Sequence, residues 1–187
     1  MPHFITRHAI FDRKIKVHAY ELGFRSKLES ILQKAPGADQ QVSKVLTDSF
    51  MELGIDKVTG GKRAFVNFSR NLLISEFAKM FPKELIAIQI GADIKPDARL
   101  ILAVKELRKE GYMIVLDDYA FQTDFMNLVP LAHMVKVDAK KIGDFIRKTI
   151  VTKLQPQGIK CLVKNVESQQ AFYKSFPMGY DFFQGVF

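Results

Sequence analysis

Two adjacent aspartates, Asp117 and Asp118, directly follow the hydrophobic run Met113–Leu116. Carboxylate oxygens suit a hard cation such as Mg²⁺ or Mn²⁺, and adjacent carboxylates can address one ion or two. The same pair also fits a helix N-cap beside a solvated acid, and the residues alone leave this alternative open. The pair therefore predicts either a metal site or the start of a helix.

A lysine, Lys136, lies between Val135 and Val137 in a second hydrophobic run. If its side chain points inward, it needs a carboxylate or phosphate partner, because burying an unpaired charge is costly. If it points outward, it extends between helices with its ammonium group in water. The pattern is compatible with both orientations.

Other catalytic chemistries have little support. The histidines show no HxH or HExxH spacing, so zinc is not expected, and no serine lies in a nucleophile-elbow context. The single cysteine, Cys161, lies in an apolar run and is expected in the core. The four histidines are His3, His8, His18 and His133.

Eight segments have strand character, and these must position the polar side chains. A turn at Asp12-Arg13-Lys14 predicts that the first two form an antiparallel hairpin. The eight segments are His3–Phe11, Lys16–Arg25, Arg63–Phe68, Glu84–Ile90, Tyr112–Asp118, His133–Asp138, Ile159–Lys164 and Tyr180–Phe187.

Helix-length segments separate the later strands. Apolar residues at helical spacing predict one helix beginning near Asp39 and ending at Gly54, and further helices at Asn71–Met80 and Asp97–Glu110. The residues of the first helix that share a face are Val42, Val45, Leu46, Phe50 and Leu53. Alternation of strand and helix predicts an α/β fold, a (β/α)₈ TIM-barrel-like barrel with an early antiparallel strand. An open doubly wound sheet is the alternative, although no glycine-rich phosphate fingerprint follows any strand.

Composition limits the class of protein. The 187 residues suffice for one domain with a substantial core, and 48% of them are apolar. No apolar stretch is long enough to span a membrane, the first residues lack a signal-peptide core, and one cysteine suits a reducing compartment, so a cytoplasmic protein is expected. The chain ends abruptly in the aromatic strand before Phe187, which suggests a longer parent protein.

The formal net charge of +8 raises the question of nucleic-acid binding. The basic residues are scattered and mixed with 20 acidic ones, and the cluster Lys105, Arg108 and Lys109 fits a solvated helix face. Nucleic-acid binding is therefore disfavoured. The charge also suits an anionic ligand or an acidic protein partner.

In a barrel of this kind, the site forms at the C-terminal ends of the strands. The polar residues in the later part of each predicted strand or just beyond it are Glu21, Arg25, Asn67, Gln89, Asp117, Asp118, Lys136, Asp138, Lys164, Glu167 and Gln184.

This ordered series resembles the EAL family, and most closely the EAL domains that are fused to an HDOD domain. The resemblance covers essentially the whole chain, so residues 1–187 are expected to form a single EAL-like domain, with an HDOD domain following in a longer protein. The matching motifs are Ile10-Phe11-Asp12-Arg13, Tyr20-Glu21-Leu22-Gly23-Phe24-Arg25, Phe65-Val66-Asn67-Phe68, Leu116-Asp117-Asp118-Tyr119, Val135-Lys136-Val137-Asp138 and Gly179-Tyr180-Asp181-Phe182-Phe183-Gln184-Gly185.

Active members of this family are cyclic di-GMP phosphodiesterases, and the resemblance implies roles for the matching residues. Glu21, Asn67 and Asp117 match metal ligands, and Asp118 matches a ligand of the second metal. Lys136 matches the lysine that orients the attacking water, and Glu167 matches a glutamate that completes the site. Arg25 and Gln184 match residues that meet the substrate. The metals, Mg²⁺ or Mn²⁺, activate water for phosphodiester displacement.

The sequence departs from the family pattern at three places. Gln89 stands where the family has a metal-binding glutamate, in Gln89-Ile90-Gly91-Ala92 instead of Glu-Ile-x-Glu. Lys164 replaces the first glutamate of Ala-Glu-x-Val-Glu, and the loop Tyr119-Ala120-Phe121-Gln122 lacks the family's Phe-Gly-Thr-Gly.

The changes at Gln89 and Lys164 shift the formal charge of the pocket by about +3, and a single charge pair at ~4 Å is worth roughly 4 kcal/mol at an effective dielectric constant near 20. We therefore expect Lys164 to take the position of a metal and to pair with Glu21, Asp117 or Asp118. The alternative is that Lys164 turns outward and weak metal binding survives.

These features predict a catalytically degenerate signalling domain that binds no metal and acts by sensing cyclic di-GMP or by contacting a protein partner or a fused HDOD domain. One alternative is an active phosphodiesterase with a weakened Mg²⁺ or Mn²⁺ site. The other is a nucleic-acid-binding protein.

Overall fold

The structure is a computed structural model that describes residues 4–25, 43–44, 46–48, 54–121 and 123–187. For Phe4, Phe24 and Arg25 the structure describes the backbone only. Most of the helix predicted after Asp39 lies outside the described residues, although Leu46 from its apolar face is fully buried.

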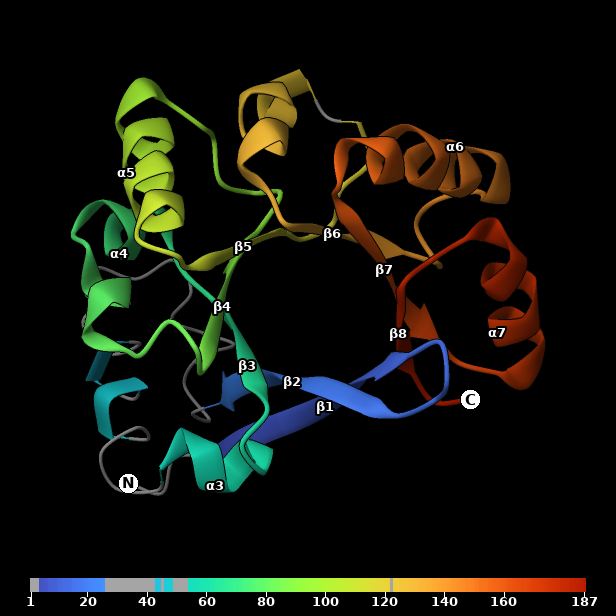
Figure 1. Cartoon of the computed structure of the whole chain (residues 1–187), viewed down its shortest axis with the longest axis horizontal. Helices are drawn as coiled ribbons and strands as arrows, with labels where there is room; N and C mark the ends of the chain where they lie inside the picture. The colour runs from blue at the N-terminus through green and yellow to red at the C-terminus, as the bar shows by residue number, and fades with distance from the viewer. Residues whose placement is uncertain (1–3, 26–42, 45, 49–53, 122) are drawn as a thin grey trace.

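Eight strands form a closed barrel in the order of the sequence, as predicted. Figure 1 shows the ring of strands with the helices outside it. All neighbouring strands from β2 to β8 are parallel, whereas β1 runs antiparallel to both β2 and β8. The strands are β1 (Phe4–Asp12), β2 (Val17–Arg25), β3 (Arg63–Asn67), β4 (Ile86–Ile90), β5 (Met113–Leu116), β6 (Met134–Asp138), β7 (Lys160–Val166) and β8 (Phe182–Gly185).

The antiparallel start of the barrel follows from a tight turn between β1 and β2. The side chain of Asp12 accepts hydrogen bonds from the backbone N–H groups of Lys14 and Lys16, at 2.8 and 2.9 Å. Ile15 takes the left-handed conformation in this turn, with φ 58°. An aspartate that caps its own turn in this way is a common hairpin device, and the predicted hairpin is confirmed.

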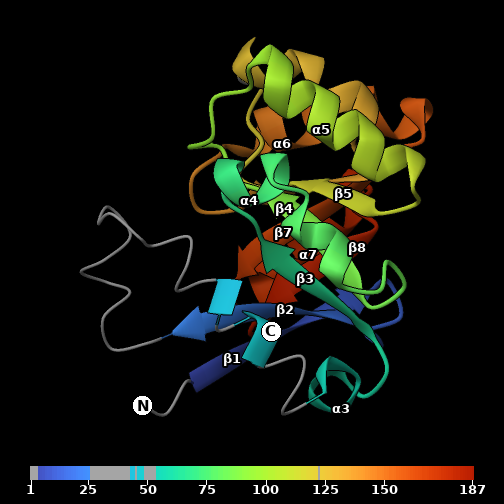
Figure 2. The ribbon, with the colours of Figure 1, turned by 90° about the vertical axis from the view of Figure 1, so that its left-hand side faces the viewer.

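The helices cover the outside of the barrel, and Figure 2 shows α5 and α6 lying across the strands on one side. The helix predicted at Asp97–Glu110 is present, and the side chain of Asp97 caps it by accepting the N–H of Leu100. The α-helices whose bounds the structure describes are α3 (Ile55–Thr59), α4 (Arg70–Ile74), α5 (Ala98–Lys109), α6 (Asp144–Leu154) and α7 (Gln169–Ser175). Short 3₁₀ helices are η2 (Phe77–Met80), η3 (Thr123–Asn127), η4 (Val129–Leu131), η5 (Gln155–Gln157) and η6 (Phe176–Met178).

The prediction of one continuous helix at Asn71–Met80 is wrong. The segment divides into α4 and η2, because Glu76 takes a left-handed conformation with φ 61°. Ser75 ends α4, and its hydroxyl donates to the carbonyl of Leu72. Such a side-chain bond to the preceding turn competes with continuation of the helix.

Two apolar layers hold the barrel. The larger cluster lies between the strands and the helices, and a smaller one fills the inside of the barrel. The inner cluster consists of Ile10, Ala19, Phe65, Ala87, Val115, Met134 and Leu162. Because side chains alternate along a strand, the residues two positions before and after these also point inward, at the two ends of the barrel. The inner cluster therefore separates two polar ends.

Within the described ranges, no helix has both the length and the apolar character needed to cross a membrane.

Candidate functional site

Lys136, in β6, points into the barrel and is completely buried. Its ammonium nitrogen lies 2.8 Å from Oε1 of Glu21 and donates to Oε1 of Gln89, also at 2.8 Å. Oδ2 of Asp117 lies 3.8 Å away. The outward orientation considered for this lysine is therefore wrong, and its buried charge is compensated by carboxylates from β2 and from the end of β5.

Glu21, in β2, uses both carboxylate oxygens. Oε1 accepts from Lys136 and from the side-chain amide of Gln89 at 2.9 Å, and Oε2 accepts from the amide of Gln184 at 2.6 Å. Burial alone would raise the pKa of Glu21, but the Lys136 ammonium group and the amide hydrogen bonds outweigh it and lower the pKa to about 2. Glu21 is thus a fixed anion at the mouth of the barrel.

Gln89, in β4, is fully buried between three of the predicted site residues. Its amide nitrogen donates to Oε1 of Glu21 and to Oδ1 of Asn67, the latter at 3.3 Å, while its amide oxygen accepts from Lys136. A carboxylate at this position has no hydrogen to donate when ionised. Gln89 therefore satisfies Glu21 and Asn67 in a way that a glutamate cannot.

Lys164, in β7, lies between the two aspartates that follow β5. Its ammonium nitrogen is 2.8 Å from Oδ1 of Asp117 and 2.7 Å from Oδ1 of Asp118. Burial lowers the pKa of Lys164, but the two carboxylates more than compensate and raise it to about 12. The structure thus contains the pairing expected for an inward-facing Lys164, and this lysine stays charged at neutral pH.

The second aspartate, Asp118, is held by two lysines. Burial raises the pKa of its carboxyl group, but hydrogen bonds from Lys164 and Lys141 lower it overall. Lys141 reaches Oδ2 of Asp118 at 2.9 Å from the loop after β6. Asp118 itself is left-handed, with φ 52°. No helix begins at this pair, so the helix-cap alternative for Asp117-Asp118 is wrong.

One predicted residue, Glu167, lies apart from the others, and a second, Arg25, is described only by its backbone. Glu167 forms an ion pair with Lys140 at 2.6 Å, and both side chains are more than half exposed. Arg25 ends β2, but its side chain lies outside the described features, so its predicted contact with a ligand stays a prediction.

Asn165 shapes the site in a way that was not predicted from the sequence. The β7–β8 ladder is irregular between Val163 and Val166, and Asn165 there has φ 59°. Its amide donates to Oδ2 of buried Asp138 at 2.8 Å. Bulges of this kind redirect side chains at barrel rims. The signal in the sequence that could have indicated this bulge is the asparagine directly after Lys164, because asparagine tolerates the left-handed conformation.

Nitrogen donors therefore lie against the oxygen atoms that match metal ligands of the EAL family. The amide of Gln89 contacts Glu21 and Asn67, and the ammonium group of Lys164 contacts Asp117 and Asp118. In the described part of the chain, no three Asp, Glu, His or Cys side chains are grouped closely enough to hold a metal ion. The donor set as arranged does not fit a divalent cation.

Two curated proteins are similar to this chain along nearly all of its length. The uncharacterized protein YuxH of Bacillus subtilis is 35% identical over 189 residues, which cover 98% of this chain and 46% of YuxH. The cyclic di-GMP phosphodiesterase CdgJ of Vibrio cholerae is 28% identical, over 98% of this chain and 43% of CdgJ. The chain thus spans a little under half the length of these relatives. No family model matches the chain.

Solved structures share the fold. The PaMucR phosphodiesterase in complex with cyclic di-GMP has a TM-score of 0.82 at 13% identity, covering 99% of this chain and 94% of that one. An EAL domain protein of Listeria monocytogenes has a TM-score of 0.72 at 17% identity, with coverages of 98% and 85%. The manganese and cyclic di-GMP complex of Klebsiella pneumoniae BlrP1 at pH 9.0 has a TM-score of 0.81 at 18% identity, with coverages of 99% and 55%.

The closed barrel, with a polar cluster at the C-terminal ends of its parallel strands, defines an α/β barrel protein. The resemblance to the EAL family is confirmed, since EAL-domain proteins are among its structural neighbours and a curated relative is a cyclic di-GMP phosphodiesterase.

Proposed function

We propose that this chain is a catalytically degenerate EAL-like signalling module, which recognises cyclic di-GMP without a divalent metal or acts through a protein partner such as a fused HDOD domain. Residues 1–187 form one module in this proposal. The observation that carries it is the contact of Lys164 with Asp117 and Asp118. In this proposal the Lys164 ammonium group stands where a metal ion would otherwise lie.

The charges of the rim support loss of the metal. A dication at this place would lie close to the ammonium group of Lys164, and Gln89 is neutral where the EAL pattern has a glutamate. Lys164 does not lose its proton easily, because its pKa is raised to about 12. Displacing it would leave two aspartates to rearrange around the ion, at the cost of two short ion pairs.

The relatives support cyclic di-GMP as the proposed ligand. PaMucR and BlrP1 are described as complexes with cyclic di-GMP, and CdgJ is named as a phosphodiesterase of the same nucleotide. A phosphodiester carries negative charge, and Lys164 is a cation about one-sixth exposed at the rim where such a ligand would lie. Metal-free recognition would use this lysine, together with Arg25.

Calorimetric titration of the chain with cyclic di-GMP, with and without Mg²⁺, tests the proposal. Micromolar binding that does not depend on Mg²⁺ supports metal-free recognition. Lys164→Met should then weaken binding, because two aspartates would face the ligand, whereas Lys148→Met on the exposed face of α6 should not. No binding under either condition favours the protein-partner form of the proposal.

A hydrolysis assay distinguishes this proposal from the alternative of an active cyclic di-GMP phosphodiesterase. Incubation with cyclic di-GMP and Mn²⁺ should give no linear dinucleotide. Formation of that product by the wild-type chain, and its loss in Asp117→Ala, would replace the proposal with an active phosphodiesterase. Salt-sensitive retention of DNA or RNA would instead favour nucleic-acid binding.

A further inference from the structure

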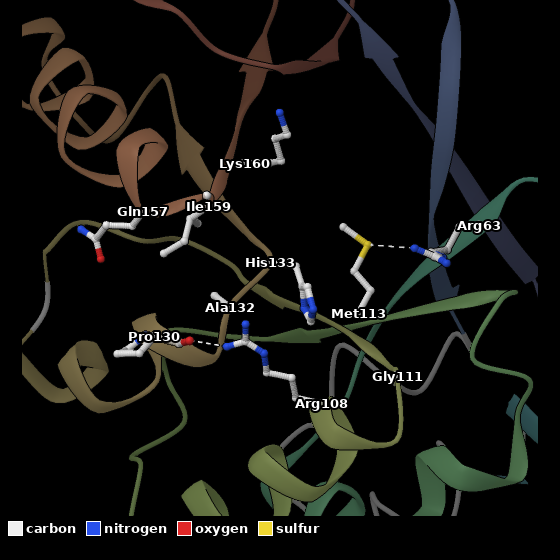
Figure 3. A pocket seen from close by; sticks show the side chains of 11 residues that line it. Arg63, Arg108, Gly111, Met113, Pro130, Ala132, His133, Gln157, Ile159 and Lys160 are labelled. Atoms are coloured by element: carbon white, nitrogen blue, oxygen red, sulfur yellow. Dashed lines mark hydrogen bonds between the residues drawn. The ribbon is translucent and has the colours of Figure 1, made fainter.

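A cavity of about 630 Å³ opens at the N-terminal ends of the strands, opposite the polar rim. It is lined by the first residues of β3, β5 and β7, namely Arg63, Met113 and Lys160, together with His133 before β6 and Arg108 from α5. Figure 3 shows the Arg108 guanidinium group beside the His133 ring, with Arg63 approaching Met113 from across the cavity. The volume lies within the range of small-molecule sites.

The charges around this cavity have one sign. Arg63, Arg108 and Lys160 line it, and no acidic residue does so within the described residues. Arg63 donates to the carbonyl of Glu84 and to Sδ of Met113, and Arg108 donates to the carbonyl of Pro130. In the part of the chain that the structure describes, neither guanidinium group forms an ion pair, whereas Lys160 pairs with Asp181 at 3.1 Å. Two half-buried arginines therefore retain uncompensated charge.

His133 adds a neutral donor. Its Nδ1 accepts the backbone N–H of Ile114 at 3.0 Å, which places the proton of the neutral ring on Nε2. Burial lowers the pKa of His133, and the positive charges of Arg108 and Arg63 lower it further. The ring is thus held neutral, in an orientation fixed by the backbone, at the edge of a positive cavity.

This cavity is separate from the rim site. Arg63 and Asn67 lie on one strand four residues apart, as do Lys160 and Lys164, which corresponds to about 13 Å along a strand. Phe65 and Leu162 lie between them and belong to the inner apolar cluster. A small ligand bound in the cavity therefore does not reach the rim site, and a ligand at the rim does not reach the cavity.

We propose that this cavity binds a small molecule carrying a doubly charged oxyanion, such as a phosphomonoester or a polycarboxylate. Guanidinium groups form paired, charge-assisted hydrogen bonds with phosphate and carboxylate oxygens. Arg63 and Arg108 approach the cavity from different elements, so together they suit two negative charges, and the Nε2–H of His133 supplies a further donor. The site would make the barrel responsive to a second, chemically distinct ligand.

Titration calorimetry of the whole chain with inorganic phosphate, ribose 5-phosphate and citrate tests this proposal. We expect at least one of these anions to bind and to shift the NMR signals of the His133 ring. Arg108→Gln should weaken binding about tenfold or more, because one charge-assisted hydrogen bond is lost. Arg99→Gln, which removes the same charge from an exposed position on α5, should change it by no more than about twofold.

The anions separate the possible ligands. Ribose 5-phosphate binding more tightly than phosphate indicates a phosphorylated metabolite, and citrate binding most tightly indicates a carboxylate. Arg63→Gln is a second variant. Because Arg63 lies in strand β3 and Arg108 on the outer helix α5, Arg108→Gln is less prone to disturb folding of the barrel. The proposal is overturned if none of the three anions binds, or if Arg99→Gln weakens binding as much as Arg108→Gln. The Lys164→Met and Arg108→Gln variants separate the two sites: Lys164→Met alters only the rim, and Arg108→Gln alters only the cavity.

Discussion

The ammonium nitrogen of Lys164 lies 2.8 Å from Oδ1 of Asp117, and this contact joins β7 to the end of β5 across the mouth of the barrel. Both side chains are nearly buried, so the pair is shielded from solvent. A metal that binds Oδ1 of Asp117 must first break this pair. Lys164 is one of two rim residues, with Gln89, that are glutamates in the family pattern.

The first prediction is that metal binding can be restored. The double variant Gln89→Glu with Lys164→Glu changes the charge of the rim by about −3, and each close charge pair is worth roughly 4 kcal/mol at an effective dielectric constant near 20. We expect it to bind Mn²⁺ at least about tenfold more tightly than the wild-type chain, as measured by electron paramagnetic resonance titration.

Lys148→Glu is the control for that titration, because it adds negative charge on the exposed surface of α6 and leaves the rim unchanged. Its Mn²⁺ affinity should match that of the wild-type chain. Tight Mn²⁺ binding by the wild-type chain, equal to that of the double variant, would contradict the prediction.

The sequence was sufficient for the barrel and for the identity of most rim residues, because strand periodicity and ordered motifs are local signals. It also predicted the partner of Lys164. It did not reveal that the amide of Gln89 bridges Glu21, Asn67 and Lys136, since that depends on how side chains from four strands meet. The basic cavity was missed for the same reason: Arg63, Arg108 and His133 meet only when the barrel closes.

The second prediction concerns the close approach of β7 and β8. A Cβ atom on Gly185 would lie 1.9 Å from the carbonyl oxygen of Val166, and this backbone atom accepts the N–H of Val186 at 2.8 Å. Gly185→Ala must push the strands apart and should lower the free energy of unfolding by about 2–3 kcal/mol. Urea denaturation measures it, with Gly143→Ala as the control. A Cβ there meets no atom within 4 Å, so the expected cost is limited to the loss of the glycine N-cap of α6, about 1 kcal/mol or less. Equal stability of the two variants would show that the strands can separate without cost.

The third prediction tests the buried charge of Lys136. Lys136→Met removes the ammonium group and leaves Glu21 and Gln89 without their shared donor, so the free energy of unfolding should fall by about 3–5 kcal/mol. The double variant Lys136→Met with Glu21→Gln removes both charges and should recover part of that loss. Guanidinium denaturation of the wild-type chain, both single variants and the double variant measures the coupling, and strict additivity of the two changes would contradict it.

The last prediction follows from the depressed pKa of Glu21. In the folded chain this pKa is about 2, against 4.5 for the ordinary carboxyl group. Because the folded value is lower, the stabilisation is fully present above about pH 5 and is lost as the pH falls from about 5 to about 2, by on the order of 3 kcal/mol. Other paired carboxylates titrate in the same range, so the measurement is a difference: the unfolding free energy of the wild-type chain minus that of Glu21→Gln, followed by urea denaturation from pH 7 to pH 3. We expect this difference to shrink as the pH falls, because the glutamine of the variant keeps the size of the side chain but carries no titrating charge. A difference that stays constant over this range would mean that Glu21 does not hold its charge through Lys136.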